Sequence, residues 1–188
     1  MERGSLDGTL TRDGLDGALA RAKGLKLMIF DVDGVMTDGT LYYSERGEEL
    51  KAFNIQDGHG IKMLRQYGVE VALITARSSR AVELRAANLG ITHLYQGVED
   101  KRGAYAALLA KLGLVAGQSG YMGDDLLDLP ILRRVGLSTC PADAVKEVLA
   151  EVDLVTRAKS GQGAVRELAE LLLKAQGHWA KLMARYEI

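Results

Sequence analysis

Short apolar runs alternate with amphipathic stretches along most of the 188-residue chain, and this alternation limits the folds available to it. Strand and helix repeated in this way are typical of a parallel sheet covered by helices on both faces. We therefore expect an α/β domain with a Rossmann-like, doubly wound parallel sheet. The expected strands are Leu25 to Phe30, Val69 to Thr75, His93 to Tyr95, Ser119 to Met122, Gly136 to Ser138 and Asp153 to Val155. The expected helices are Gly58 to Tyr67, Ser78 to Leu89, Lys101 to Leu112, Leu126 to Arg134, Ala142 to Ala150 and Ala164 to about Ala184.

Two aspartates come directly after the first expected strand, in Asp31-Val32-Asp33-Gly34. One carboxylate at such a position can attack while the other transfers a proton. An isolated motif of this kind is also typical of a turn or a helix cap. A calcium loop is excluded, because Val35 and Met36 stand where an EF-hand needs a ligand and a glycine. The glycine-rich phosphate-loop pattern is absent from the sequence.

Three further signals repeat this placement along the chain. Thr75 ends an expected strand, Asp124 and Asp125 follow another, and Lys101 begins a helical pattern between them. Ligands of parallel sheets bind beyond the carboxyl ends of the strands, where these residues meet. Lys101 alone is equally typical of a surface charge, and Thr75 of a simple strand end. Asp124, Asp125 and Asp128 are a stronger signal, because three acids in the first turn of a helix repel one another. A helix dipole stabilises each of them by only about 0.3–1 kcal/mol, so a bound metal explains their clustering better.

Together these residues predict a magnesium-assisted phosphate site. A carboxylate that attacks a phosphomonoester dianion needs a hard cation between Asp31 and a phosphate oxygen, and Asp124 is the second expected anchor for Mg²⁺. Lys101 adds positive charge, and Thr75 can donate its hydroxyl to another phosphoryl oxygen. Asp33 can protonate the departing alkoxide and then accept a proton from the water that cleaves an aspartyl phosphate.

The amino-acid composition argues against nucleic acid and membranes as binding partners. The apolar fraction of 47% is enough for a full core in one domain, and the net charge of −1 gives no long-range attraction to nucleic acid or to an anionic membrane. No apolar run reaches the length of a membrane span or of a signal-peptide core. The single Cys140 excludes an intrachain disulfide framework and suits a reducing cytoplasm. We expect a soluble cytoplasmic protein that binds neither nucleic acid nor membrane.

One segment departs from the alternation of strand and helix. Residues 40–53 carry β-formers on both sides of Ser44-Glu45-Arg46-Gly47, which predicts a small projecting β-hairpin. The hairpin and one helix use most of the interval between Asp38 and Ile74, so no cap domain fits there. Residues 1–24 are polar and glycine-rich, with only a hint of a helical turn from Leu15 to Ala22, and we expect a loosely held lead-in. The domain itself is expected over residues 25–188.

The motifs resemble the four ordered motifs of the haloacid dehalogenase superfamily of phosphatases. They are Asp31 to Asp38, Thr75-Ala76-Arg77, Lys101, and Gly123-Asp124-Asp125 with Asp128. The resemblance implies that Asp31 is the nucleophile and Asp33 the general acid and base. It also implies that Asp31, Asp124 and the backbone carbonyl of Asp33 hold Mg²⁺. Ala76 stands where many relatives have glycine, which removes no functional group.

Within that superfamily, three segments resemble the 3-deoxy-D-manno-octulosonate 8-phosphate phosphatases. They are Glu48 to Asn54 with Asp57-Gly58, Leu89 to Gly97, and Gly161 to Glu167. Ser160 precedes Gly161 where a glycine pair is common. The resemblance implies release of the free sugar acid for lipopolysaccharide synthesis by a homotetramer whose hairpins meet centrally. It places these residues around the sugar phosphate: Asp33, Asn54, Asp57, Gly58, Lys62, Arg77, Arg85 and Lys101.

Without a cap, the specificity must come from the rim of the site or from another subunit. Lys62, Arg77 and Arg85 are candidates for binding a substrate carboxylate, although Lys62 and Arg85 are equally compatible with solvated helix charges. The flexible segment Ser160 to Gly163 is a candidate for bringing the C-terminal tail across a neighbouring site. A phosphatase for the 9-phosphate of a nonulosonic, sialic-type acid is an alternative, because one extra carbon cannot be read from rim charges. A silent scaffold of the same fold is a second alternative.

Overall fold

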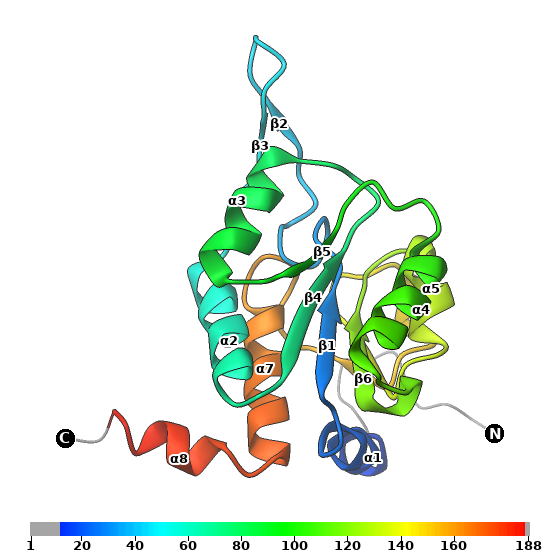
Figure 1. Cartoon of the computed structure of the whole chain (residues 1–188), viewed down its shortest axis with the longest axis vertical. Helices are drawn as coiled ribbons and strands as arrows, with labels where there is room; N and C mark the ends of the chain where they lie inside the picture. Colours follow the sequence, from blue (N-terminus) through cyan, green and yellow to red (C-terminus); the bar gives the residue numbers. More distant parts are fainter. Residues whose placement is uncertain (1–11, 187–188) are drawn as a thin grey trace.

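A six-stranded parallel sheet forms the centre of the computed structural model, which describes residues 12–186 (Figure 1). The strands are β1 (Leu27–Phe30), β4 (Glu70–Ile74), β5 (His93–Tyr95), β6 (Ser119–Met122), β7 (Leu137–Cys140) and β8 (Leu154–Val155). Their order across the sheet is β5-β4-β1-β6-β7-β8, so the chain starts near the middle and extends first to one edge and then to the other. This is the doubly wound α/β topology that the sequence predicts.

Helices cover both faces of the sheet, because alternate strand residues point in opposite directions. Met28 and Phe30 of β1 belong to one core cluster, whereas Leu27 and Ile29 belong to a second cluster on the other face. The first cluster lies under α1 (Arg12–Ala22), α2 (Ile55–Gln66), α3 (Arg80–Leu89), α7 (Ala164–Ala175) and α8 (Trp179–Met183). The second lies under α4 (Lys101–Leu112), α5 (Leu129–Leu132) and α6 (Lys146–Leu149). Among residues 12–186 there is no helix long and apolar enough to cross a bilayer.

Several helix ends differ from the sequence prediction, and local chemistry explains the main differences. The helix expected up to Ala184 ends at Ala175, because Gly177 adopts a positive φ of 75° and α8 begins separately. The expected helix from Leu126 divides into the 3₁₀ turn η2 (Leu126–Asp128) and α5, where Pro130 lies in the first turn. Helix α2 begins at Ile55, before the expected start, because Asn54 caps it. A second 3₁₀ turn, η1 (Ala116–Gln118), precedes β6, and the expected helix from Ala142 is reduced to α6.

The expected hairpin is present and projects from the domain, as Figure 1 shows. Strands β2 (Tyr42–Tyr43) and β3 (Glu49–Leu50) pair antiparallel, with Tyr42 opposite Leu50. Within residues 12–186 no larger insert lies between the motifs, which is the capless arrangement that the sequence predicts.

The expected lead-in contains a docked helix. Ala18 and Ala22 of α1 are fully buried in the first core cluster, and the side chain of Gln176 donates to the carbonyl oxygens of Ala22 and Leu25 at 3.0 Å each. Small residues on one face of α1 allow this close packing against the domain. Residues 12–24 are therefore held more firmly than expected, whereas residues 1–11 lie outside the described part of the chain.

Candidate active site

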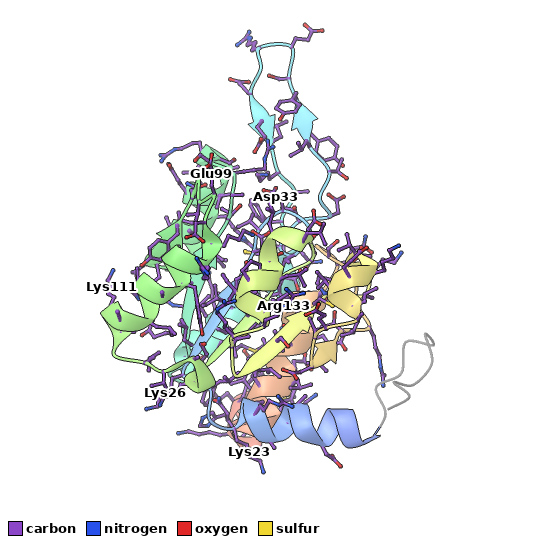
Figure 2. The ribbon with its side chains drawn as sticks, turned by 90° about the vertical axis from the view of Figure 1, so that its right-hand side faces the viewer. Lys23, Lys26, Asp33, Glu99, Lys111 and Arg133 are labelled. Atoms are coloured by element: carbon purple, nitrogen blue, oxygen red, sulfur yellow. The ribbon has the colours of Figure 1, made fainter. Side chains whose placement is uncertain are left out.

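The two aspartates of the first motif lie at the carboxyl end of β1. The backbone N–H of Asp31 donates to the carbonyl of Met122 at 3.0 Å, so Asp31 extends the pairing of β1 with β6. Side chains still point to alternate faces of the sheet at this position, and that of Asp31 is buried on the α4 side. Asp33, two residues on, is half-buried below the hairpin (Figure 2). Lys23 and Lys26, by contrast, lie at the opposite end of the molecule. The candidate site therefore lies at the end of the sheet from which the hairpin projects.

A buried lysine links the first and last motifs. The ammonium group of Lys101, at the start of α4, lies 3.0 Å from Asp31 Oδ2 and 2.7 Å from Asp128 Oδ1. Tyr121 of β6 donates its hydroxyl to the same Asp128 oxygen at 2.6 Å. All four side chains are at least nine-tenths buried. Attraction to the two carboxylates raises the pKa of Lys101 although burial opposes this, so the lysine remains charged.

Asp128 anchors the loop that carries Asp124. Its second carboxylate oxygen accepts the backbone N–H groups of Asp124 at 2.9 Å and Asp125 at 3.2 Å. A side chain at Gly123 would collide with Asp128, since an added Cβ would lie 2.4 Å from its carboxyl carbon. Asp125 itself caps the η2 turn by accepting the N–H of Leu126 at 2.7 Å. The acids of this loop thus have separate tasks, and Asp124 is left facing the first motif.

The arrangement of oxygens fits a hard divalent cation. Ligand atoms of Asp31, Asp124 and Asp128 lie within 4.8 Å of one another. Asp31 Oδ1 and Asp124 Oδ1 are buried without a hydrogen-bond partner, whereas both oxygens of Asp128 accept hydrogen bonds. Gly34, at a φ of 82°, lies so close to Asp124 that an added Cβ would be 2.0 Å from its Oδ2. Asp31 and Asp124 therefore offer the free oxygens for Mg²⁺, while Asp128 supports them.

Burial and the closeness of these carboxylates also raise the pKa values of Asp31 and Asp124. Burial, together with the nearby charge of Asp128, raises the pKa of Asp31 to about 7, although Lys101 opposes the shift. Burial and the charges of Asp128 and Asp31 raise the pKa of Asp124 to about 8. A group of like charges buried together is costly unless a cation compensates it. These shifts agree with the unpartnered oxygens, because a bound divalent cation would favour the ionised form of both acids.

Thr75 and Arg77 follow the carboxyl end of β4, the strand that pairs with β1. Thr75 is buried, and its hydroxyl oxygen accepts the backbone N–H of Arg77 at 3.4 Å, so the hydroxyl hydrogen is available to a ligand. The guanidinium of Arg77 reaches back to the hairpin, where it donates to Glu49 Oε2 at 2.6 Å and to the hydroxyl of Tyr43 at 3.1 Å. Arg77 Nε also lies 3.9 Å from Asp33 Oδ2.

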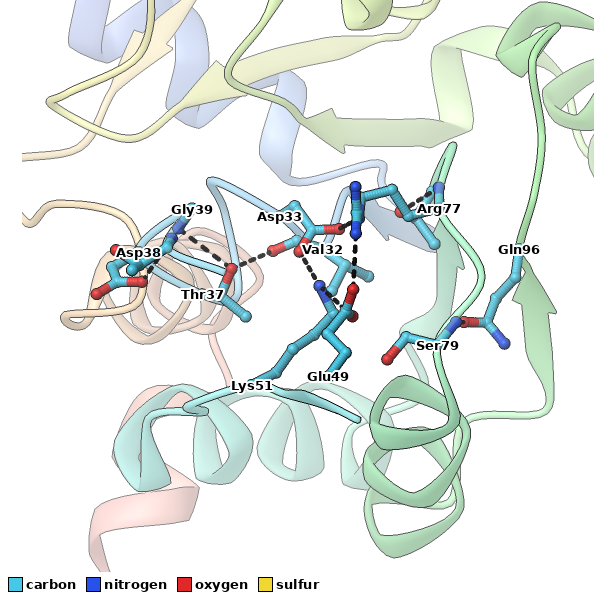
Figure 3. Close-up of polar contacts among 12 residues, drawn as sticks. Val32, Asp33, Thr37, Asp38, Gly39, Glu49, Lys51, Arg77, Ser79 and Gln96 are labelled. Carbon is cyan, nitrogen blue, oxygen red and sulfur yellow. Dashed lines mark hydrogen bonds and ion pairs between the residues drawn. The ribbon is translucent and has the colours of Figure 1, made fainter. Parts of the chain in front are cut away.

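Glu49 and Lys51 of the hairpin take part in the site, which sequence reasoning did not predict. The Lys51 ammonium contacts Asp33 Oδ1 and lies 3.1 Å from Glu49 Oε1 (Figure 3). The Lys51 side chain is only 1% exposed. The signal was present in the segment Glu48 to Asn54 that carries the family resemblance, but spacing alone does not show that this segment folds back onto Asp33.

Three residues predicted around the sugar phosphate have contacts that stabilise the fold. Asn54 caps α2 by accepting the N–H groups of Gln56 and Asp57 at 2.7 and 3.2 Å. Asp57 is buried, and its oxygens accept the N–H groups of Gly163 and Arg166 at the start of α7. Gly58 allows close approach, since an added Cβ would lie 2.2 Å from Arg85 Nη2. The Asp57 side chain is therefore committed to α7 and does not face an open site.

Lys62 and Arg85 lie apart from the aspartates. They line a surface hollow of about 310 Å³ between α2 and α3, together with Ile55, Gly58, His59, Asn88 and Leu89. Arg85 donates to the carbonyl of Asn54 at 2.8 Å and stacks over the ring of Phe53. The lining of this hollow contains none of the catalytic candidates. Within the described residues of a single chain, Lys62 and Arg85 thus lie at a hollow that is separate from the aspartates. The predicted residues that do meet at one end of the sheet are Asp31, Asp33, Arg77, Lys101 and Asp124.

Comparison with known proteins identifies the family. The chain is 50% identical over 159 residues to the 3-deoxy-D-manno-octulosonate 8-phosphate phosphatase of Escherichia coli K12, covering 85% of each chain. The chain belongs to this family. Its phosphatases share the fold as well as the sequence. The crystal structure of the Moraxella catarrhalis phosphatase, in complex with magnesium ion, phosphate ion and KDO, matches with a TM-score of 0.90 at 41% identity, covering 92% of this chain and 99% of that one.

A third relative is a metal-bound form. The cobalt-bound phosphatase of Haemophilus influenzae matches with a TM-score of 0.83 at 40% identity, covering 85% of this chain and 94% of the other. No protein-family model matches the chain. The neighbouring structures confirm the haloacid dehalogenase fold that the sequence predicts. The acid cluster of Asp31, Asp124 and Asp128 fits the Mg²⁺ that the sequence also predicts.

Proposed function

We propose that this phosphatase hydrolyses 3-deoxy-D-manno-octulosonate 8-phosphate to the free sugar acid and inorganic phosphate. The observation that carries the proposal is the pair of buried, unpartnered oxygens of Asp31 and Asp124 beside a charged Lys101. This arrangement matches what a phosphate dianion and Mg²⁺ require, and the family relationship supplies the substrate. We place the reaction in the bacterial cytoplasm, in the supply of the acid to lipopolysaccharide.

Each catalytic candidate has a role in two displacements at phosphorus. Asp31, Asp124 and the backbone carbonyl of Asp33 would hold Mg²⁺, which would supply positive charge to offset that of the phosphate. Asp31 attacks phosphorus as the bond to the sugar oxygen breaks, and Asp33 donates a proton to that oxygen. Asp33 then takes a proton from the water that attacks the aspartyl phosphate, which releases phosphate and restores Asp31. Lys101 and Thr75 stabilise the phosphoryl oxygens.

Recognition of the acidic sugar is assigned to basic residues on two subunits. Arg77 lies beside Asp33 and is 43% exposed, so its guanidinium is accessible to a substrate carboxylate. Lys62 and Arg85 lie in the hollow between α2 and α3, and we propose that they act on the site of a neighbouring subunit. Asn54, Asp57 and Gly58 support this recognition by positioning α2, α7 and Arg85.

The assembly proposed for this sharing is a homotetramer in which the hairpins meet. Tyr42 and Leu50 lie opposite each other on the two strands and are 49% and 60% exposed. Apolar side chains paired on a two-stranded hairpin favour burial against another copy. Phe53, by contrast, is partly buried and packs against the domain core. The segment Ser160 to Gly163, which the sequence predicts to be flexible, is instead anchored: Ser160 is buried and donates its backbone N–H to Asp143 Oδ1 at 2.8 Å, and Gly161 donates to the carbonyl of Val35 at 3.0 Å.

Phosphate release from a panel of phosphate esters tests the function. We expect turnover of 3-deoxy-D-manno-octulosonate 8-phosphate to exceed that of a nonulosonic acid 9-phosphate and of simple sugar phosphates, and to be lost with a chelator. Arg77→Ala and Arg85→Ala should impair hydrolysis of the sugar acid much more than hydrolysis of a small aryl phosphate, because only the former carries a second anion for a guanidinium. Turnover that favours the nine-carbon substrate would replace the substrate assignment, and no turnover of any ester would support a silent scaffold.

Sedimentation together with activity tests the assembly. The double change Tyr42→Asp and Leu50→Asp should yield species smaller than a tetramer, because burying two carboxylates at the contact is costly. Activity on the sugar acid should fall by at least about tenfold, while activity on a small aryl phosphate should change little. The matched control is Leu84→Asp on α3, which changes another exposed leucine. A fully active monomer would refute the shared site.

A further inference from the structure

Four charged side chains form a closed ring at the base of the hairpin. Lys51 contacts the carboxylates of both Asp33 and Glu49, and Arg77 contacts the same two carboxylates from the other side (Figure 3). The ring has two positive and two negative charges, so it is neutral as a whole. Arg77 also holds the pKa of Glu49 at about 2, which keeps this carboxylate ionised. The ring connects the general acid and base to the arginine assigned to substrate recognition.

Lys51 is the group that fixes Asp33 within this ring. Asp33 Oδ1 accepts from Lys51, whereas Asp33 Oδ2 has no hydrogen-bond partner and lies 3.9 Å from Arg77 Nε. Arg77 is 43% exposed and can move, but the Lys51 side chain is 1% exposed and is held at its other contact by Glu49. A general acid must be held within hydrogen-bond reach of the atom it protonates, so the contact that fixes its carboxylate affects the rate.

We propose that Lys51 is a positioning residue for catalysis, which orients Asp33 toward the leaving oxygen and, through Glu49, sets Arg77 relative to it. The inference rests on the proposed function for its substrate. It assigns the hairpin a part in the chemistry as well as in assembly. One buried ammonium group then positions both the arginine that binds the acidic sugar and the aspartate that protonates its leaving group.

The dependence on the leaving group tests this assignment. We compare kcat/KM for the sugar phosphate, whose alkoxide needs a proton, with that for p-nitrophenyl phosphate, whose phenolate departs without one. Lys51→Met should lower the first value by about 10- to 100-fold and the second by no more than about threefold, since a general acid is worth roughly 10²–10⁴. Lys51→Arg should restore part of the loss because it still donates to Asp33. Lys111→Met, an exposed lysine on α4, is the matched control.

Equal losses on the two substrates would overturn the proposal, because a merely structural role affects both alike. If Lys51→Met fails to fold, Glu49→Gln provides the second test. It should raise KM for the acidic sugar at least about threefold through a loosened Arg77 and raise KM for p-nitrophenyl phosphate less, because that ester has no second anion for Arg77 to bind. An unchanged KM would refute the link to Arg77. If the wild-type protein does not hydrolyse the sugar acid phosphate, the proposed function fails separately, and the comparison is made with an alkyl phosphate that it does hydrolyse.

Discussion

Both carboxylate oxygens of Asp128 accept hydrogen bonds within the protein, so neither is free to bind a ligand. Asp128 accepts from the buried side chains of Lys101 and Tyr121 and from the backbone amides of Asp124 and Asp125. Its effect on catalysis is therefore indirect, through the position of the lysine and of the loop that carries Asp124. A residue of this kind stabilises the fold and organises the site at the same time.

Replacing Asp128 by alanine should destabilise the protein strongly. The change leaves Lys101 and the Tyr121 hydroxyl buried with fewer partners, and breaking such a buried pair costs about 3–5 kcal/mol in the free energy of unfolding. Urea denaturation measures this loss. Glu170→Ala is the control, because Glu170 pairs with Arg166 and Lys174 on a more exposed helix face and its removal should cost no more than about 1 kcal/mol. Equal losses for the two variants would contradict the buried network.

Asp31→Asn should abolish turnover without unfolding the protein. The amide removes the attacking charge and a metal ligand but hardly changes the side-chain volume, and loss of a nucleophile costs about 10⁴-fold or more. Phosphate release measures the activity, and circular dichroism checks the fold. Asp16→Asn on α1 is the control and should retain full activity. Appreciable turnover by the Asp31 variant would defeat its assignment as nucleophile.

At the scale of secondary-structure elements, one carboxylate joins two helices that pack together. Asp57 belongs to the first turn of α2, but it accepts backbone N–H groups at the start of α7, more than 100 positions later in the chain. No N-cap side chain of α7 itself serves this purpose, because its N-cap is Gly163 with a φ of 110°. A residue of α2 thus supplies the missing cap and fixes how α7 meets the sheet.

Asp57→Ala should therefore destabilise the protein by about 2–3 kcal/mol, since two part-buried N–H groups lose their acceptor. Asp57→Asn keeps one acceptor oxygen and should cost less. Thermal or urea unfolding gives the values. Asp100→Ala is the matched control, because Asp100 occupies the N-cap position of α4 without making a side-chain cap bond, and its loss should stay within about 0.5 kcal/mol. A cost for Asp57→Ala no greater than for this control would contradict the cap.

At the scale of the whole molecule, the fold gathers more negative charge at the site than it neutralises without a cation. The folded state raises the pKa of Asp31 to about 7 and that of Asp124 to about 8. A raised pKa means that the protonated acid is favoured by folding. Its contribution to stability is present below the ordinary pKa of a carboxyl group and is lost as pH rises through the raised values.

The metal-free protein should therefore lose stability between about pH 4 and pH 8, and Mg²⁺ should restore more of it at the upper end. Thermal unfolding in a chelator and in excess Mg²⁺ at several pH values measures both effects. Asp124→Asn should flatten the pH dependence and weaken the response to Mg²⁺, because it removes one of the two shifted acids. A wild-type response to Mg²⁺ that does not change with pH would contradict a role for these acids in binding the cation.

The features that depend on local order along the chain could be predicted from the amino-acid sequence. Apolar periodicity gave the parallel strands and most of the helices, and β1 places Asp31 at its carboxyl end because alternation along a strand is a local property. Strands β5 and β6 and helix α4 have the predicted bounds. The motifs were sufficient to predict Asp31, Asp33, Lys101 and Asp124 as neighbours, since strand ends of a parallel sheet meet at one edge.

The three-dimensional packing determines which distant side chains contact one another, and the sequence did not predict these contacts. This packing turned Asn54 and Asp57 toward backbone amides, placed Lys62 and Arg85 at a separate hollow, and brought Lys51 of the hairpin onto Asp33. It also docked α1 against the domain, where composition alone suggested a loose segment. The physical reason is that spacing along the chain sets the face on which a residue lies, whereas the partner of a buried charge depends on how separate elements pack.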